Sequence, residues 1–126
     1  QKPMILAVTA LTSLDAADLK AIGVNEDVSS YVTRLARLAQ ENGADGVICA
    51  APEIEMLRKS CGPDFKLVVP GIGPKGSAAG DQKGVTTPGK ALKLGADHLV
   101  IARPITKADD PEASALSIAR ELIEAA

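Results

Sequence analysis

The sequence predicts an α/β fold in which four short strands alternate with helices. Four apolar runs, each followed by a segment with helix signals, give the order that is typical of parallel strand–helix units. Hydrophobic residues make up 46% of the 126 residues and aromatic residues only 2%. The core must therefore consist of Ala, Val, Ile and Leu, as in sheets covered by helices on both faces. The length fits one domain spanning residues 1–126.

Short apolar runs bounded by turn-forming residues predict the strands, at 4–11, 46–50, 65–71 and 98–103. Capping residues and apolar spacing predict the helices, at 15–23, 27–43, 51–62, 87–95 and 110–126. The clearest helix is 27–43, because its apolar side chains recur at spacings of three and four. Thr87 and Pro88 supply the cap and the first residue of the helix that follows.

One eight-residue pattern occurs twice, as G-A-D-G-V-I-C-A at 43–50 and as G-A-D-H-L-V-I-A at 95–102. Each copy runs from the end of a helix through Ala-Asp into an apolar strand. Repetition of a larger unit and convergence on one loop chemistry both explain the pattern, and the sequence leaves both open. In either case the two segments belong to the same kind of layer.

The strand count leaves the architecture incomplete. A closed (β/α)8 barrel takes about 250 residues, and this chain has half that length. A lone four-stranded arc would leave two open edges and an uncovered apolar face. Either the sheet stays open, as in flavodoxin-like folds with helices on both faces, or two copies close a barrel by pairing the edge strands 4–9 and 98–103.

Composition argues against several classes of partner. The net charge is −2 and the charges are scattered, so no basic face is available for nucleic acid. No stretch approaches the roughly 20 apolar residues of a membrane span, and no signal peptide is expected. Cys49 and Cys61 lack the spacing of a metal or redox site, which favours buried thiols in a reducing cytoplasm and no metal.

The carboxyl ends of parallel strands are where such folds place their chemistry. The loop 71–86, after the third predicted strand, contains five glycines, including Gly71, and an amide donor in Gln82. Arg103 closes the fourth predicted strand, where its guanidinium can bind phosphate oxygens, and the amides that follow it are candidates for a helix-terminal anion site. A phosphate grip and a mobile glycine-rich surface loop both remain open at this point.

Four blocks of the chain resemble the second half of bacterial orotidine 5'-phosphate decarboxylase. They are A-V-T-A-L-T-S at 7–13, D-G-V-I-C-A-A-P-E at 45–53, P-G-I-G-P-K-G-S-A-A-G-D-Q-K at 70–83 and V-I-A-R-P-I-T at 100–106. The resemblance implies half of a TIM (β/α)8 barrel, a (βα)4 unit, from an enzyme of pyrimidine biosynthesis. That enzyme uses no cofactor, is usually a homodimer and converts orotidine monophosphate to uridine monophosphate.

The resemblance also assigns residues. Gln82 and Arg103 match ligands of the substrate phosphate, with the backbone of Gly71 and Ala102 beside them, and 71–86 matches the lid over that phosphate. On the pyrimidine side, Thr12 matches the hydroxyl residue that faces the base and Pro70 the proline packed near it.

Departures from the family pattern matter as much. The catalytic signature D-x-K-x-x-D is absent from these 126 residues, so no catalytic residue is assigned. Gly73 and Gly84 stand where bacterial members usually carry Arg, and Ala102 stands where they carry Gly, which predicts weaker phosphate binding. Engineering and natural drift would both give these changes.

We therefore interpret the chain as a catalytically inactive, self-associating half-barrel that retains affinity for phosphate or a nucleoside monophosphate. The alternative is a decarboxylase fragment that works when the missing half is supplied.

Overall fold

A computed structural model describes residues 1–74 and 86–126, and these form one parallel four-stranded sheet in the order β1-β2-β3-β4. The strands are β1 Leu6–Val8, β2 Gly46–Ile48, β3 Lys66–Val69 and β4 His98–Leu99. The number, order and parallel pairing of the predicted strands are confirmed. Each strand is shorter than predicted, because the chain turns into loops or helices soon after the paired residues.

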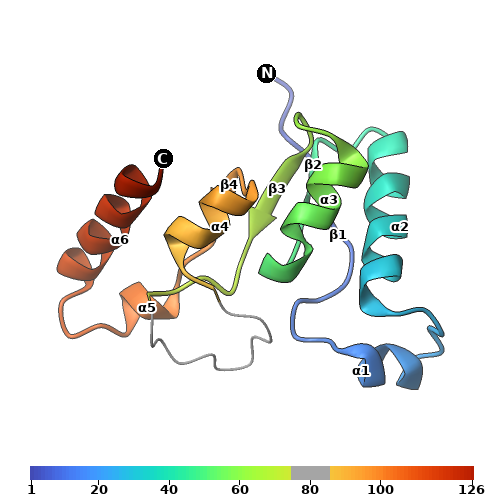
Figure 1. Cartoon of the computed structure of the whole chain (residues 1–126), viewed down its shortest axis with the longest axis horizontal. Coiled ribbons are helices and arrows are strands. Elements are labelled where there is room, and N and C mark those ends of the chain that lie inside the picture. Colours follow the sequence, from blue (N-terminus) through green and yellow to red (C-terminus); the bar gives the residue numbers. More distant parts are fainter. Residues whose placement is uncertain (75–85) are drawn as a thin grey trace.

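Helices follow every strand (Figure 1). They are α1 Ala16–Ala21, α2 Val28–Glu41, the short 3-10 helix η1 Ala51–Glu53, α3 Ile54–Cys61, α4 Pro88–Leu94, α5 Arg103–Thr106 and α6 Pro111–Ala125. The predicted caps Asp15, Thr87 and Asp110 are present, since each side chain accepts a hydrogen bond from the first turn of its helix. Asp27 caps α2 in the same way. Helix α5 was not predicted, because its first residue, Arg103, was assigned to the fourth strand.

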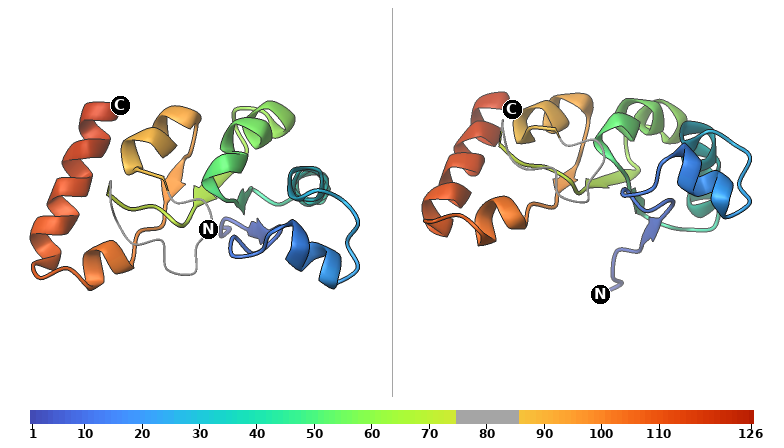
Figure 2. Two further views of the ribbon diagram at one scale, coloured as in Figure 1. Left: turned by 60° about the horizontal axis from the view of Figure 1, so that its bottom comes forward. Right: turned by 90° about the horizontal axis from the view of Figure 1, so that it is seen from below.

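The long helices α2, α3, α4 and α6 all lie on one side of the sheet (Figure 2). On that side Val47, Leu67 and Val69 pack into a core with Ile54 and Leu57 of α3, and all five side chains are fully buried. The flavodoxin-like alternative, with helices on both faces, is therefore wrong for the described residues. A one-sided helix layer is the arrangement of a barrel wall, not of a flavodoxin-like sheet.

The opposite face of the sheet is largely apolar and is open at its two outer strands, whereas Val68 of β3 is buried there. Val8 is 60% exposed, and Val100, just beyond β4, is 48% exposed. Leu6 and Ile48 lie on the same face and are partly buried. In a closed (β/α)8 barrel this face would point inward and be covered by the other strands.

The twice-occurring sequence pattern has one structure. Asp45 donates its backbone N–H to the carbonyl of Ile5 at 2.8 Å and accepts the N–H of Ile5 on its carboxylate at 2.7 Å. Asp97 does the same with Leu67, at 3.0 and 2.8 Å. Each aspartate thus ties the start of its strand to the strand before it, so β3 and β4 repeat the arrangement of β1 and β2.

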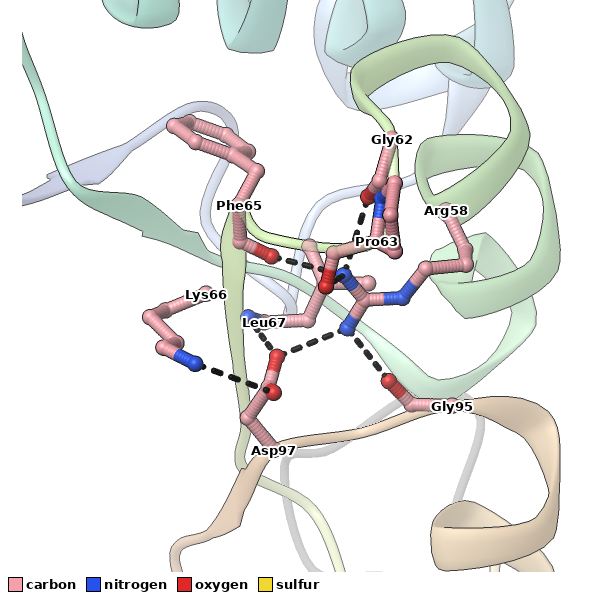
Figure 3. Close-up of polar contacts among 8 residues, drawn as sticks. All are labelled: Arg58, Gly62, Pro63, Phe65, Lys66, Leu67, Gly95 and Asp97. Atoms are coloured by element: carbon pink, nitrogen blue, oxygen red, sulfur yellow. Dashed lines mark hydrogen bonds and ion pairs between the residues drawn. The ribbon is translucent and has the colours of Figure 1, made fainter.

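A second set of contacts fixes the same, amino-terminal edge of the sheet (Figure 3). The guanidinium of Arg58, on α3, donates to Asp97 at 2.7 Å and to four backbone carbonyls, those of Gly62, Pro63, Phe65 and Gly95. Lys66 Nζ lies 3.6 Å from the other carboxylate oxygen of Asp97. This Arg58 cluster joins α3, β3 and β4 on the side away from the candidate site.

Candidate phosphate-binding site

The candidate site lies at the carboxyl-terminal edge of the sheet, where α1 and α5 also lie (Figure 1). Four chain segments end there, following β1, β2, β3 and β4. The segments after β3 and β4 are neighbours, and the N–H of Val100 donates to the carbonyl of Val69 at 2.9 Å just before both strands end. This edge therefore brings together residues 70–74 and 102–106.

The segment after β3 is shaped by one glycine. Gly71 has φ of 71°, a left-handed conformation that side chains rarely adopt, so the chain bends sharply after Pro70. Beyond the bend, Ile72 forms a parallel bridge with Thr86, and Gly73 donates its N–H to the carbonyl of Thr86 at 3.2 Å. The two ends of the loop 71–86 are thus held together. Gln82, a predicted phosphate ligand, lies outside the described residues.

The segment after β4 presents Arg103 as the first residue of α5, on the surface. Ala102 precedes it as the helix cap, and its carbonyl accepts the N–H groups of Ile105 and Thr106 at 2.9 and 2.8 Å. Pro104 has no N–H. The amides after Arg103 are therefore engaged or absent, and the predicted helix-terminal anion site is wrong. What this segment offers to an anion is the guanidinium of Arg103.

On the pyrimidine side, Thr12 and Pro70 are not adjacent. Pro70 follows β3, beside the strand that leads to Arg103, whereas Thr12 lies in the turn after β1, at the opposite end of the strand order. The N–H of Leu14 closes that turn by donating to the carbonyl of Leu11 at 3.0 Å. The structure therefore puts Pro70, Gly71, Ala102 and Arg103 after two neighbouring strands, β3 and β4, and Thr12 after the outer strand β1.

Glu53 also lies at this edge, although no sequence pattern predicted a role for it. Its carboxylate accepts the N–H of Ala50 at 2.8 Å, so the side chain folds back onto the residue that precedes η1, two positions beyond β2. Burial raises the pKa of Glu53 above its usual value, and the hydrogen bond from Ala50 offsets only part of this effect. Glu53 is the third residue after Ala50, which precedes η1, and this is the glutamate position of a capping box, the signal that could have identified it.

Neighbouring Cys49 is fully buried, as predicted. Burial raises the pKa of its thiol to about 12, and the nearby carboxylate of Glu53 adds to the effect. The thiol is therefore protonated at neutral pH and structural in character. Within residues 1–74 and 86–126, no group of three or more His, Cys, Asp or Glu side chains could hold a metal ion. The same residues contain no helix that is both long and apolar enough to cross a membrane.

Four parallel strands, each followed by a helix, with polar and glycine residues at the carboxyl-terminal edge, define half of a TIM-barrel protein. The model of the orotidine 5'-phosphate decarboxylase / HUMPS family matches residues 1–118. This chain belongs to that family.

Known relatives show how much of the family's barrel the chain represents. Orotidine 5'-phosphate decarboxylase of Actinobacillus pleuropneumoniae serotype 5b (strain L20) is 54% identical over 109 residues, which are 86% of this chain and 47% of that protein. The enzyme of Trichlorobacter lovleyi is 50% identical over 123 residues, 98% of this chain and 51% of that protein. The crystal structure of orotidine 5'-phosphate decarboxylase from Lactobacillus acidophilus superposes with a TM-score of 0.82 at 36% identity, covering 97% of this chain and 50% of that one. The chain thus spans about half the length of these relatives, and its fold is a (βα)4 half of a TIM barrel.

Proposed function

We propose that this chain is the phosphate-binding half of a decarboxylase-type barrel, and that its 126 residues bind inorganic phosphate or a nucleoside monophosphate without decarboxylating it. The observation that carries the proposal is the adjacency of two segments. Arg103 and the glycine bend at Gly71 follow neighbouring strands and meet at one edge of the sheet. A guanidinium beside a backbone that approaches closely is suited to phosphate oxygens.

The absence of turnover follows from chemistry that the sequence does not contain. Decarboxylation needs a proton donor for the carbon that loses carbon dioxide, and the D-x-K-x-x-D signature that supplies it in the family is not in these residues. Among the described residues at the strand ends, Glu53 does carry a carboxyl group. That group accepts a backbone hydrogen bond from Ala50, and no lysine has been assigned as its catalytic partner. No cofactor is invoked.

Self-association is the second part of the proposal. The open apolar face and the two outer strands need strands to cover them, and a second copy of the chain supplies four. Two free, buried thiols fit a reducing compartment such as the cytoplasm. Neither nucleic acid nor a membrane is among the proposed partners.

Calorimetric titration with inorganic phosphate and with uridine monophosphate tests the binding. Arg103→Ala should weaken binding by about 1.5–3 kcal/mol, the contribution of a hydrogen bond to a charged group, or roughly 10- to 100-fold. Arg34→Ala is the matched control, because Arg34 is an exposed arginine on α2, away from the site. Equal affinity in Arg103→Ala and wild type, or no binding by wild type at millimolar ligand, would contradict the proposal.

A second candidate function is favoured by the extent of the family match. Since the relatives are about twice as long, the chain is also suited to act as a decarboxylase when the first half of such a barrel is present. Mixing it with residues of the Actinobacillus enzyme that precede the matched region should then produce uridine monophosphate from orotidine monophosphate. Each half alone, and the mixture carrying Arg103→Ala, are the controls. A mixture no more active than its separate halves would reject this function.

A further inference from the structure

We propose that two copies of this chain close an eight-stranded barrel in one particular register, with Met4 of one copy beside His98 of the other. The inference rests on the self-association proposed above and adds how the copies meet. Among residues 1–74 and 86–126, no strand neighbours the outer edge of β1 or that of β4. In a two-fold closed ring, β4 of each copy pairs with β1 of the other, and this happens twice.

The helices at the two ends of the arc both carry exposed apolar side chains. On α6, Leu116, Ala119 and Ile123 are exposed and share one stripe, because they are spaced by three and four residues. On α2, Leu35 and Leu38 form part of a similar stripe, and Leu38 is exposed. Helices α6 and α2 lie at opposite ends of the molecule (Figure 1). Closing the ring brings α6 of one copy to the end of the other that carries α2.

The internal repeat predicts the register. Since Asp45 binds Ile5 as Asp97 binds Leu67, the pair β1–β2 is repeated by β3–β4. The relation that maps β1 onto β3 and β2 onto β4 can be applied a second time. It then maps β3 onto β1 of a second copy, and β2 onto β4 as before. The observed pairing of β2 with β3 is then the template for the pairing of β4 with that β1.

Transferring the template gives specific partners. The β2–β3 pairs are Gly46 with Lys66, Val47 with Leu67, and Ile48 with Val68. Their equivalents between copies are His98 with Met4, Leu99 with Ile5, and Val100 with Leu6. The N–H of Lys66 donates to the carbonyl of Asp45 at 3.0 Å, so the N–H of Met4 should donate to the carbonyl of Asp97 in the other copy.

Barrel geometry gives the same register independently. Leu6 pairs with Gly46, and Gly46 pairs with Lys66. Because Val68 pairs with His98, Lys66 lies opposite Ala96, so Leu6 and Ala96 lie on one line across the four strands. With Met4 beside His98, Ala96 is level with residue 2 of the next copy. The shift is 6 − 2 = 4 residues per copy, or 8 for two copies. A (β/α)8 barrel has a shear of about 8 residues.

Other registers fail this requirement. Moving the pairing by one residue would turn apolar side chains of one strand to the wrong face, so only steps of two are allowed. Such steps give a shear of about 4 or about 12, neither of which is the value for eight tilted strands. A second copy therefore satisfies the open edges, the inward face and the closure condition together.

Disulfide cross-linking measures the register directly. In the double variant Leu6→Cys with Val100→Cys, the two new thiols face each other only between copies, because β1 and β4 are separated by two strands within one chain. The Cα distance of directly paired residues falls in the range that a disulfide spans, about 4.4–6.8 Å. The matched control is Val8→Cys with Val100→Cys, which moves one thiol by two residues on the same face.

We expect mild oxidation to convert most of the Leu6/Val100 variant, and little of the Val8/Val100 variant, to a covalent dimer on non-reducing gels. A stronger cross-link in the Val8/Val100 variant, or a dimer that neither variant links, would overturn this register while leaving self-association standing. Sedimentation of the wild-type chain as a monomer would overturn both, without bearing on the phosphate titration. If the variants do not fold, hydrogen exchange of the wild-type chain decides, since the amides of Leu6 and Ile101 should gain protection as concentration rises.

Discussion

Replacing Arg58 by alanine tests how the sheet is held at its amino-terminal edge. The guanidinium donates to four carbonyls and to Asp97, and the two charged side chains are only 22% and 23% exposed. Loss of one partner from a fully buried ion pair costs about 3–5 kcal/mol. Water reaches part of this cluster and replaces some of the bonds, so we expect the free energy of unfolding to fall by about 2–4 kcal/mol.

The chain offers a matched control in Arg34→Ala. Arg34 also binds a carboxylate, that of Glu26, but the two side chains are 55% and 36% exposed. Exposed ion pairs contribute about 0–1 kcal/mol. Urea unfolding followed by far-ultraviolet circular dichroism should therefore separate the two variants clearly. Equal losses for Arg58→Ala and Arg34→Ala would refute the view that burial and the carbonyl contacts make the Arg58 cluster important.

The pH dependence adds a second criterion. Burial acts to raise the pKa of Asp97, but the N–H of Leu67, the guanidinium of Arg58 and the ammonium of Lys66 outweigh it and lower the pKa. A lowered carboxyl pKa stabilises the fold above the unfolded value of about 3.9, and this stabilisation is lost as the pH falls through the folded pKa. The difference in the free energy of unfolding between wild type and Arg58→Ala should be largest at pH 7 and should become smaller below about pH 4. A gap that stays constant would refute the electrostatic part of the argument.

Three further predictions concern single residues. A Cβ on Gly46 would collide with the backbone oxygen of Lys66. Gly46→Ala should therefore lower the free energy of unfolding, measured in urea, by about 3 kcal/mol or more. A decrease of less than about 1 kcal/mol would contradict this steric argument. Because burial raises the pKa of Glu53, its ionised form destabilises the fold at neutral pH, and Glu53→Gln should raise stability at pH 7 but not near pH 4. With its pKa raised to about 12, Cys49 should react with iodoacetamide at pH 8 only through unfolding, and rapid native labelling would show that the thiol is accessible.

The sequence predicted the strand–helix order because each unit carries its own local signals. Thr87 and Asp110 cap helices as expected, and Gly43 and Gly95 have positive φ where the preceding helices end. The apolar runs could not predict which face of the sheet is covered. Val47 points to the helices and Ile48 to the open face, and both are apolar, as the wall of a barrel requires.

The position of the candidate site at one edge of the sheet was predictable, but the geometry of that edge was not. Strand ends identified Pro70, Gly71 and Arg103, because parallel strands place their carboxyl ends at one edge. The start of α5 at Arg103 was missed, since the apolar run leading to it resembles a continuing strand. The loss of the amide site follows from Pro104 and from the bonds to Ala102, which depend on how the turn closes. Local sequence does not specify that closure.

The two edges of the sheet divide the tasks of the chain. The amino-terminal edge holds the paired aspartates and the Arg58 cluster, whose bonds lie within one chain and need no partner to form. The carboxyl-terminal edge holds the surface-exposed Arg103 and the bend at Gly71, the two features that we propose bind phosphate. A partner that closes the barrel would add strands beside β1 and β4. It would leave the contacts at the amino-terminal edge and the groups at the carboxyl-terminal edge unchanged. Binding of phosphate should therefore depend on Arg103 in every assembly, whereas decarboxylation should depend on which strands complete the ring.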